Sequence, residues 1–177
     1  MTAGFNSARL RILEARSTLD ALDSESLYTR TIQILSPSVV SQLPPYFSGI
    51  KTEKLAQAWF DRMLKESRLF LVYQTDKQQL IGFSFLFLDE SNTKRKEAHL
   101  GYLLAEETWG QGFASELVTA LIEHSQQNNI ADRLIAGVDE TNLASIALLK
   151  KVGFRPVENN GTNTLTFRLE LHTQASI

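Results

Sequence analysis

The feature that most constrains this chain is a glycine-containing turn between a strand-like run and a long amphipathic helix. Residues 98–104 alternate as a strand, and after Trp109-Gly110-Gln111-Gly112 the apolar side chains recur at helical spacing. Two glycines at such a turn expose backbone N–H groups and let a ligand approach the main chain closely. The following helix adds a partial positive charge of roughly +0.5 at its start. The pattern therefore predicts a phosphate-binding turn.

Two common phosphate-binding motifs do not fit this turn. A Walker A loop requires Gly-Lys-Ser/Thr after four intervening residues, and the chain contains no such run. A dinucleotide-binding fingerprint needs glycine or alanine where this chain has Ser115, and it occurs in a βαβαβ repeat early in a domain. The turn therefore indicates another class of phosphate ligand.

Composition is that of one ordinary globular domain. The chain has 177 residues, of which 43% are hydrophobic and 21% charged. Its net charge is −2, and the basic run Lys94-Arg95-Lys96 is short and lies in a polar loop, so no nucleic-acid partner is indicated. The chain has no cysteine, which excludes disulfides, thiol catalysis and thiolate metal ligands.

The sequence indicates neither a membrane segment nor a metal site. Residues 1–7 lack the apolar run of a signal peptide, and no stretch approaches ~18 consecutive apolar residues. No spacing of His, Asp or Glu suggests metal ligation. We therefore expect a cytoplasmic protein without metal or membrane partner, either a monomer or a homodimer.

The N-terminal part predicts one strand and two helices. Residues 9–14 alternate polar and apolar side chains, as an edge strand does. Ser17 is a candidate cap for a helix that runs to about Leu35, and Thr52 is a candidate cap for a second helix. The predicted buried face of the second helix comprises Leu55, Ala58, Trp59 and Met63.

The rest of the chain predicts further strands and two helices. The helices start after Gly112 and at Thr141 or Asn142, and Gly153 ends the second one. The predicted strands are 69–73 and 80–88 as a hairpin, 98–104, 134–138, and a closing pair 154–157 and 164–171 with a turn at Asn160-Gly161.

This order predicts an α/β (α+β) fold. We expect a single domain over 8–172 with short tails at 1–7 and 173–177. Its sheet should be mixed, mostly antiparallel and twisted, with six or seven strands and flanking helices. One parallel βαβ crossover should pass through the helix after Gly112.

Four motifs in this order carry a resemblance to a known family. They are Gly101-Tyr102-Leu103-Leu104, the turn 109–116, Asn142-x-x-Ser145 and Lys151-Val152-Gly153-Phe154-Arg155. Together they resemble the GNAT superfamily of acetyl-CoA-dependent N-acetyltransferases, and within it the RimJ/RimL-type branch, which acetylates ribosomal-protein N-termini. The resemblance extends from about residue 9 to 171 and is strongest after residue 69. It implies two central strands that splay apart beside the acetyl group.

The resemblance also implies how acetyl-CoA is held. Main-chain amides of the turn wrap the pyrophosphate, and the strand 101–104 pairs with the pantetheine arm. Trp109 takes the place where the family usually has Gln or Arg, so we expect the turn to depend on backbone donors and the helix dipole rather than on a cationic side chain. The implied cofactor-binding residues are Tyr102, Leu103, Leu104, Trp109, Gly110, Gln111, Gly112, Phe113, Ala114, Ser115, Asn142, Ser145 and Lys150.

Structural roles compete with these implied roles for three polar residues. Asn142 fits a plain helix cap as well as a pantetheine contact, and Ser145 fits a helix serine that bonds the local backbone. Lys150 fits a solvated lysine at a helix end as well as a ligand of the 3′-phosphate.

Amide formation requires the amine to lose a proton and the thiolate to leave. Many GNAT enzymes protonate the thiolate with a tyrosine, but the matching residue here is Leu149. The resemblance implies Ser145 as the candidate donor, because its position matches the serine used in the RimJ/RimL-type branch. A glutamate often occupies the strand position of His99; an imidazole suits base duty at neutral pH, and Glu97 lies on the same strand face to orient or replace it.

The expected acceptor is the α-amine of a peptide or protein N-terminus. Such an amine has a pKa near 7.7–8.0, against about 10.4 for lysine, so it needs the weaker base. The alternatives are a small-molecule amine (polyamine, amino sugar, amine-bearing antibiotic or toxin) and a non-catalytic acetyl-CoA-binding module. For a polyamine, the carboxylates of Asp89, Glu90 and Glu97 are candidates. The segments expected to shape the acceptor pocket are 33–50 and 88–97.

Overall fold

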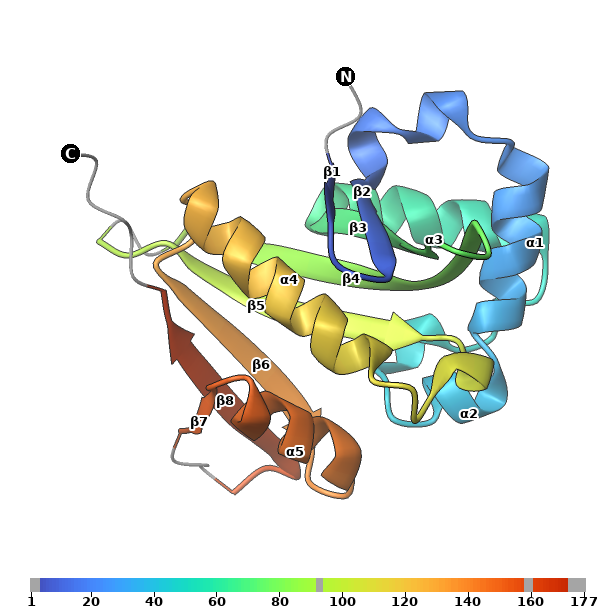
Figure 1. The fold of residues 1–177 in the computed structure, drawn as a ribbon. Coiled ribbons are helices and arrows are strands. Elements are labelled where there is room, and N and C mark those ends of the chain that lie inside the picture. The colour runs from blue at the N-terminus through green and yellow to red at the C-terminus, as the bar shows by residue number, and fades with distance from the viewer. Residues whose placement is uncertain (1–3, 92–93, 158–160, 172–177) are drawn as a thin grey trace. The chain divides into compact units, whose positions relative to one another are not determined.

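The computed structural model describes residues 4–91, 94–157 and 161–171 (Figure 1). Among these residues it has eight strands, against the six or seven predicted, in the order β1-β2-β3-β4-β5-β6-β8-β7. The chain divides into two compact units, and strands β4, Gln79–Asp89, and β5, Glu97–Leu104, contribute residues to both. Unit 1 comprises Met1–Phe85 and Tyr102–Phe113, and unit 2 comprises Leu86–Gly101 and Ala114–Ile177.

Unit 1 contains a run of antiparallel strands. Strand β2, Leu10–Glu14, pairs with β3, Arg68–Gln74, on one side and with β1, Gly4–Asn6, on the other. Its alternation places Leu10 and Ile12 in the core and Arg11 in solvent. Strand β1 was not predicted; it lies within 1–7, the segment expected to be a tail.

The first helix of unit 1 begins later than predicted. Two short 3-10 helices, η1 Ala15–Ser17 and η2 Leu19–Ala21, precede α1, Ser24–Ile34. Thr18 Oγ1 donates to the Glu14 carbonyl at 2.9 Å, which satisfies a backbone acceptor outside any α-helix. Asp23 is the actual cap, since its Oδ2 accepts from Ser26 N at 3.1 Å. The prediction of Ser17 as cap was therefore wrong.

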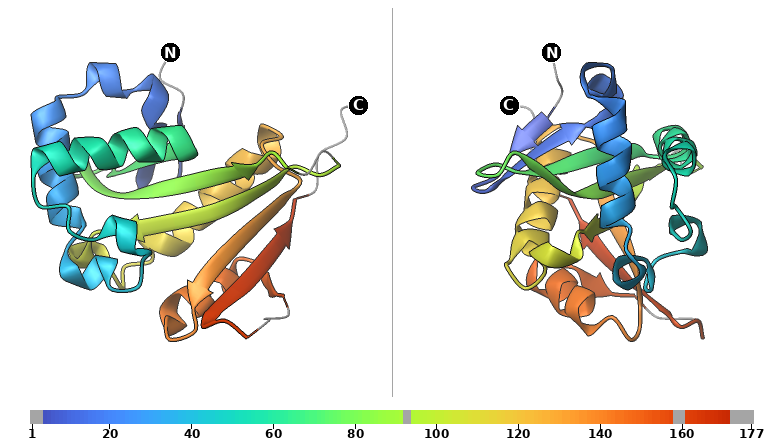
Figure 2. Two further views of the ribbon diagram at one scale, coloured as in Figure 1. Left: turned by 180° about the vertical axis from the view of Figure 1, so that it is seen from behind. Right: turned by 90° about the vertical axis from the view of Figure 1, so that its right-hand side faces the viewer.

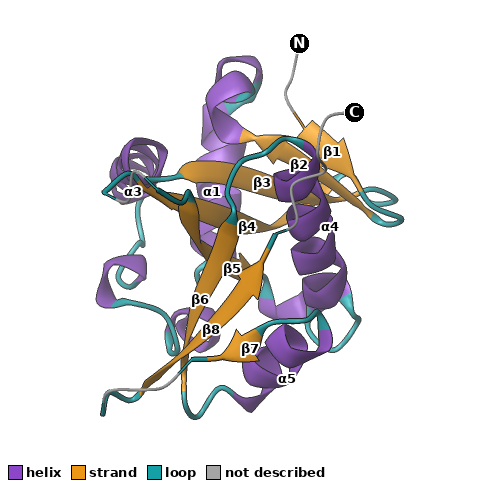
Figure 3. Ribbon diagram, turned by 90° about the vertical axis from the view of Figure 1, so that its left-hand side faces the viewer, coloured by secondary structure: helices purple, strands orange, loops and turns teal. Residues whose placement is uncertain are grey.

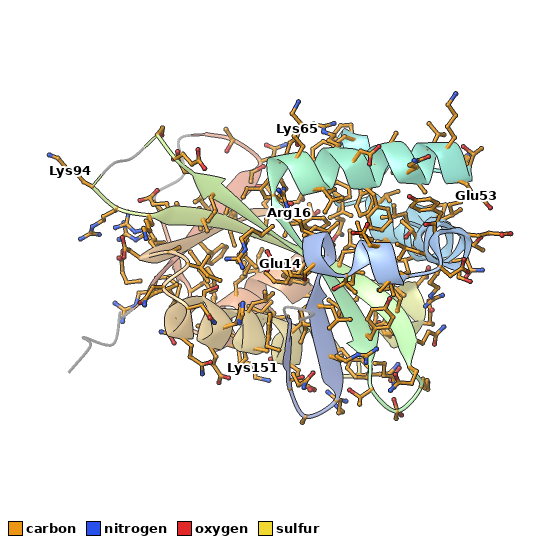
Figure 4. The ribbon with its side chains drawn as sticks, turned by 90° about the horizontal axis from the view of Figure 1, so that it is seen from above. Glu14, Arg16, Glu53, Lys65, Lys94 and Lys151 are labelled. Carbon is orange, nitrogen blue, oxygen red and sulfur yellow. The ribbon has the colours of Figure 1, made fainter. Side chains whose placement is uncertain are left out.

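Three further helical segments complete unit 1 before β3, namely α2 Pro37–Val40, η3 Pro45–Phe47 and α3 Glu53–Glu66. Thr52 caps α3 as predicted, with Oγ1 accepting from Leu55 N at 3.3 Å. Figure 4 shows Glu53 and Lys65 near opposite ends of α3, where they complement the helix dipole.

The buried face of α3 is rotated from the predicted one. Leu55 and Ala58 are exposed, and the buried residues are Ala56, Trp59, Phe60 and Met63. Aromatic contacts determine this face, because the Trp59 and Phe60 rings pack edge-on against Phe83 with centroids at 5.1 and 5.7 Å. The Tyr28 ring of α1 lies 5.7 Å from that of Phe60, so the two helices share this cluster.

Strand β6, Arg133–Asp139, of unit 2 pairs in parallel with β5, as predicted for a crossover through the helix after Gly112. The elements that contribute to this unit after β5 are α4 Phe113–Gln127, β6, α5 Leu143–Lys151, β7 Arg155–Pro156 and β8 Thr164–Glu170. Strand β6 is parallel to β5, whereas β6–β8 and β7–β8 are antiparallel (Figure 3). The β5–β6 ladder ends at His99–Ile135, although β6 continues its pairing with β8 to Asp139–Thr164.

The sheet of unit 2 has one covered face and one uncovered face. Helices α4 and α5 lie on the same side of β6 and β8 (Figure 1). The buried residues Leu134, Ala136, Val138 and Phe167 share one face of these two strands. Seen from behind, β6 and β8 lie in front of these helices, and no helix of unit 2 lies over them (Figure 2). Apolar and polar side chains alternate along β8, as predicted, so that Thr164, Thr166, Arg168 and Glu170 form its polar outer face. Gly161 has φ +82°, as a turn requires, but the predicted turn partner Asn160 lies outside the described residues.

Candidate active site

The glycine turn occupies the predicted place in unit 1. It follows the 3-10 helix η4, Glu106–Thr108, and leads directly into α4. Gly110 and Gly112 have φ of +70° and +81°, a backbone conformation that side chains with a Cβ rarely adopt. Phe113 is buried as the first residue of α4, and the exposed residues Trp109–Gly112 precede it. The amides of the turn therefore lie at the positive end of a 15-residue helix.

Side chains within the turn hold its backbone shape. Gln111 Nε2 donates to the Glu107 carbonyl at 2.9 Å, and Trp109 Nε1 donates to the Leu104 carbonyl at 2.9 Å. Thr108 Oγ1 donates to the Ala105 carbonyl at 2.7 Å. Although its indole N–H is engaged, Trp109 remains 50% exposed. Three side-chain hydrogen bonds to backbone carbonyls therefore link the turn to the residues just before it.

An ion pair attaches this region to helix α1. Arg30 Nη2 contacts Glu107 Oε1 at 2.5 Å, and Arg30 Nε donates to the Leu80 carbonyl at 2.8 Å. The hydrogen bond from Arg30 holds the pKa of the Glu107 carboxyl below its usual value. Sequence reasoning gave no sign of this pair, because 77 positions separate the two residues.

A cationic side chain from outside the turn lies against it, which the sequence analysis did not identify. Arg9 Nη1 donates to the Gln111 carbonyl at 3.0 Å, and its guanidinium lies 4.3 Å from the centre of the Phe113 ring. A Cβ built on Gly112 would lie 3.4 Å from Arg9 Nη2. Arg9 thus covers a carbonyl oxygen that would otherwise present negative charge beside the amides. It was missed because it precedes the turn by about a hundred positions.

Strand β5 contributes its last residues to unit 1. Leu103 and Leu104 are buried, and Tyr102 is partly exposed. The leucine side chains belong to the core, so these residues can meet a ligand only through their backbone.

The predicted ligands of unit 2 begin with the first turn of α4, where Ala114 and Ser115 are partly exposed. On α5, Asn142 is the helix cap, with Oδ1 accepting from Ser145 N at 3.1 Å. The structural role proposed for Asn142 is therefore present, which leaves its amide NH₂ as the group a ligand would meet. Leu143 beside it is 73% exposed.

The far end of α5 carries two further residues that the sequence analysis named, Leu149 and Lys150. Leu149 is buried, so the position where many GNAT enzymes have a tyrosine is part of the core. Lys150 is exposed in the last turn, where a cation complements the helix dipole.

The two candidate bases on β5 differ in their surroundings. Glu97 has a side chain only 15% exposed, and its Oε1 accepts from Arg133 Nη1 at 2.8 Å. His99 is exposed at the last pair of the β5–β6 ladder. Bonds from Ser91 lower the pKa of the Asp89 carboxyl, and the charge of His99 adds a smaller effect in the same direction. The His99 side chain is thus exposed to solvent, whereas the Glu97 carboxylate forms an ion pair with Arg133.

Within the described ranges 4–91, 94–157 and 161–171, no cluster of three His, Asp or Glu side chains fits a metal ion. No described helix is long and apolar enough to cross a membrane.

Comparison with known proteins identifies the family. Residues 16–155 match the family model described as an acetyltransferase (GNAT) domain. The chain is 26% identical over 151 residues to "Uncharacterized N-acetyltransferase p20" of Bacillus licheniformis, a match that covers 77% of this chain and 83% of that protein.

Solved structures show the same fold. RimL, the ribosomal L7/L12 alpha-N-protein acetyltransferase in complex with coenzyme A, superposes with a TM-score of 0.75 and 16% identity over 97% of this chain and all of that one. The Microcin C7 self-immunity acetyltransferase MccE, in complex with acetyl-CoA and AMP, has a TM-score of 0.66 and 17% identity over 93% of each chain. The chain thus belongs to the GNAT family, as the four motifs predicted, and is an acetyl-CoA-dependent N-acetyltransferase.

Proposed function

We propose that the acceptor of this acetyltransferase is the N-terminal α-amine of a peptide or protein. The observation that carries the proposal is that His99 is exposed while the nearby Glu97 is ion-paired with Arg133. Strand β5 therefore offers the acceptor one imidazole base and no pair of carboxylates. A weak base suits an amine whose pKa is near 7.7–8.0. The fold likeness to RimL, an alpha-N-protein acetyltransferase, agrees with this choice.

We assign the cofactor residues as follows. In unit 1, the amides of Gly110, Gln111, Gly112 and Phe113 bind the pyrophosphate, Trp109 lines the turn, and the backbone of 102–104 pairs with the pantetheine. Arg9 adds a guanidinium to this phosphate site, which replaces the charge that Trp109 cannot supply. In unit 2, the amides of Ala114 and Ser115, the Asn142 amide, Ser145 and Lys150 contact the cofactor.

The chemistry is a direct transfer in a ternary complex. The neutral amine attacks the thioester carbonyl, a C–N bond forms, and the C–S bond breaks as the thiolate leaves. His99 accepts the ammonium proton directly or through one water, and the Ser145 hydroxyl donates a hydrogen bond to the departing sulfur. The amides of the glycine turn and the dipole of α4 bind the cofactor and take no part in proton transfer.

The two alternative functions have weaker support. A polyamine requires converging carboxylates, yet Glu97 is bonded to Arg133, and Asp89 Oδ1 accepts from both N and Oγ of Ser91 at 2.9 and 2.5 Å. MccE shows that a self-immunity acetyltransferase shares this fold. A module that binds acetyl-CoA without transfer remains the alternative that the buried Leu149 leaves open.

The proposal is tested by coenzyme A release with a panel of amines. N-terminal Ser, Ala and Met peptides, their Nα-blocked forms with an internal lysine, spermidine and an aminoglycoside are compared at equal concentration. We expect turnover with free N-termini and none with the blocked peptides. Turnover confined to spermidine or the aminoglycoside would reject the N-terminal acceptor, and binding of acetyl-CoA without any turnover would favour the non-catalytic module.

A further inference from the structure

The uncovered face of the unit 2 sheet carries a concentration of arginines, which we call the arginine face: Arg95, Arg133, Arg155 and Arg168 with the carboxylates Glu97 and Glu170. We propose that this face binds an acidic N-terminal segment of the acceptor and so selects acidic peptides and proteins for acetylation. This inference rests on the proposed function and specifies its substrate class.

Strand register places the arginines in line with the candidate base. His99 is paired with Ile135, Ile135 with Arg168, and Arg168 with Arg155, so the four residues form one row across β5, β6, β8 and β7. Register partners lie on the same face of a sheet. The row therefore leads from His99 directly to two arginines within unit 2.

Among the described residues, this face has fewer carboxylates than guanidinium groups. Glu170 is shared, since its Oε1 lies 2.8 Å from Arg133 Nε and 3.4 Å from Arg168 Nε, and its Oε2 lies 3.4 Å from Arg95 Nη1. Glu97 contacts Arg133. Asp139 lies on the same face of β6 as Arg133, and its Oδ1 accepts from Thr141 N and Oγ1. Among the described residues, the arginine face thus has four guanidinium groups against the three carboxylates of Glu97, Glu170 and Asp139, an excess of positive charge on a chain whose net charge is −2.

The excess positive charge is exposed at the cross-strand pair Arg155 and Arg168. Like charges directly opposite each other on neighbouring strands destabilise a sheet. Arg168 nevertheless has a side chain 48% exposed, and Arg155 is exposed on the two-residue strand β7. An anion bound between the two guanidinium groups would relieve their repulsion. This charge complementarity indicates that the ligand of the arginine face is acidic.

The spacing fixes where the acidic residues of the acceptor should be. Neighbouring strands lie about 4.8 Å apart, so the backbones of Arg168 and Arg155 lie about 10 and 14 Å from that of His99. An extended peptide advances about 3.3 Å per residue. An acceptor whose α-amine meets His99 would therefore bring its fourth residue to Arg168 and its fifth to Arg155.

The test compares two peptides that share the same three N-terminal residues. One has Asp or Glu at positions four and five and the other has Lys there, and kcat/KM is measured for both at low and high salt. We expect the wild-type protein to prefer the acidic peptide about fivefold to tenfold at low salt, because each exposed ion pair contributes little. High salt should reduce the preference.

Charge reversal identifies the surface responsible. Arg168→Glu and Arg155→Glu should each abolish or invert the preference for the acidic peptide. Arg168→Gln removes the charge without reversing it and should weaken the preference, so it serves as the second variant where Arg168→Glu disturbs the folding of β8. Lys151→Glu is the matched control, because it makes the same charge change on exposed α5 of the same unit. It should keep the wild-type preference.

The outcomes separate the inference from the proposed function. Equal kcat/KM for the two peptides, or a preference that Lys151→Glu removes as fully as Arg168→Glu, overturns the role of the arginine face while leaving N-terminal acetylation intact. Acetylation of spermidine or an aminoglycoside with neither peptide acetylated overturns the proposed function, and the inference with it.

Discussion

The glycine turn of unit 1 and the arginine face of unit 2 present ligands with different parts of the chain. The turn offers backbone amides, and its side chains Trp109 and Gln111 bond inward to carbonyl oxygens. The arginine face offers side chains on an ordinary pleated sheet. We infer that the turn is sensitive to changes in backbone conformation and tolerant of side-chain polarity, whereas the face tolerates changes of shape and responds to charge.

The largest effect is expected from Gly112→Val. Valine would have to adopt φ near +81° and would put a Cβ 3.4 Å from Arg9 Nη2, on the surface where the pyrophosphate approaches. For the wild-type protein, coenzyme A at a hundred times its Kd should add about 2.7 kcal/mol to the free energy of unfolding. We expect the variant to show no rise in Tm with coenzyme A.

Gly49→Val is the control for backbone strain. Gly49 also has positive φ, at +79°, and a Cβ there would meet no atom within 4 Å. This variant should lose stability in the absence of cofactor yet retain the coenzyme A shift. If both variants bind coenzyme A normally, the turn does not hold the pyrophosphate.

The next effect concerns the base. His99→Ala should lower kcat by about a hundredfold or more near pH 7, because general bases contribute roughly 10²–10⁴. The deficit should shrink as pH rises past the pKa of the α-amine, when the acceptor deprotonates without help. A pH–rate profile with an N-terminal Ser peptide measures this, and a wild-type rate throughout would assign the proton to a water chain or to Glu97.

A smaller effect is expected from Arg9→Met, which keeps an apolar contact with Phe113 and removes the charge. Loss of a charge-assisted contact to phosphate at an exposed site should raise the Kd for coenzyme A about fivefold to tenfold. Acetyl-pantetheine, which lacks the phosphates, should bind both proteins alike. Arg11→Met is the matched control, since Arg11 stacks on Tyr73 at 5.5 Å in the neighbouring strand. Equal coenzyme A affinity in the two variants would contradict the role of Arg9.

Local signals predicted much of this molecule. The caps Thr52 and Asn142, the two-glycine turn and the apolar stripe of α4 depend on residues within a few positions of one another, so the sequence contains their whole cause. The parallel pairing of β5 with β6 through α4 followed from the same local order.

Tertiary contacts explain what was missed. Arg9 meets the turn from the loop before β2, and Glu97 is bonded to Arg133 on a strand reached only after α4. The face of α3 was misread because Phe60, adjacent to Trp59, packs against β4 and rotates the helix away from the predicted stripe. No spacing in the sequence encodes such pairings.

The smallest effect tests a turn of unit 2 that, unlike the glycine turn, depends on a side chain. Asp139 Oδ1 accepts from Thr141 N at 2.8 Å and from Thr141 Oγ1 at 2.5 Å just before α5, and the side-chain bond first and the backbone bond second lower the pKa of this carboxyl. A carboxyl whose folded pKa lies below the ordinary 3.8 stabilises the fold above that value, and the stabilisation is lost as pH falls through the folded pKa. Asp139→Asn keeps an oxygen acceptor but removes the charge. Urea unfolding should therefore show wild type slightly more stable than the variant at neutral pH, with a difference that is constant down to about pH 5 and declines below it. A difference that persists undiminished in acid would show that the oxygen acceptor of Asp139, and not its charge, closes this turn.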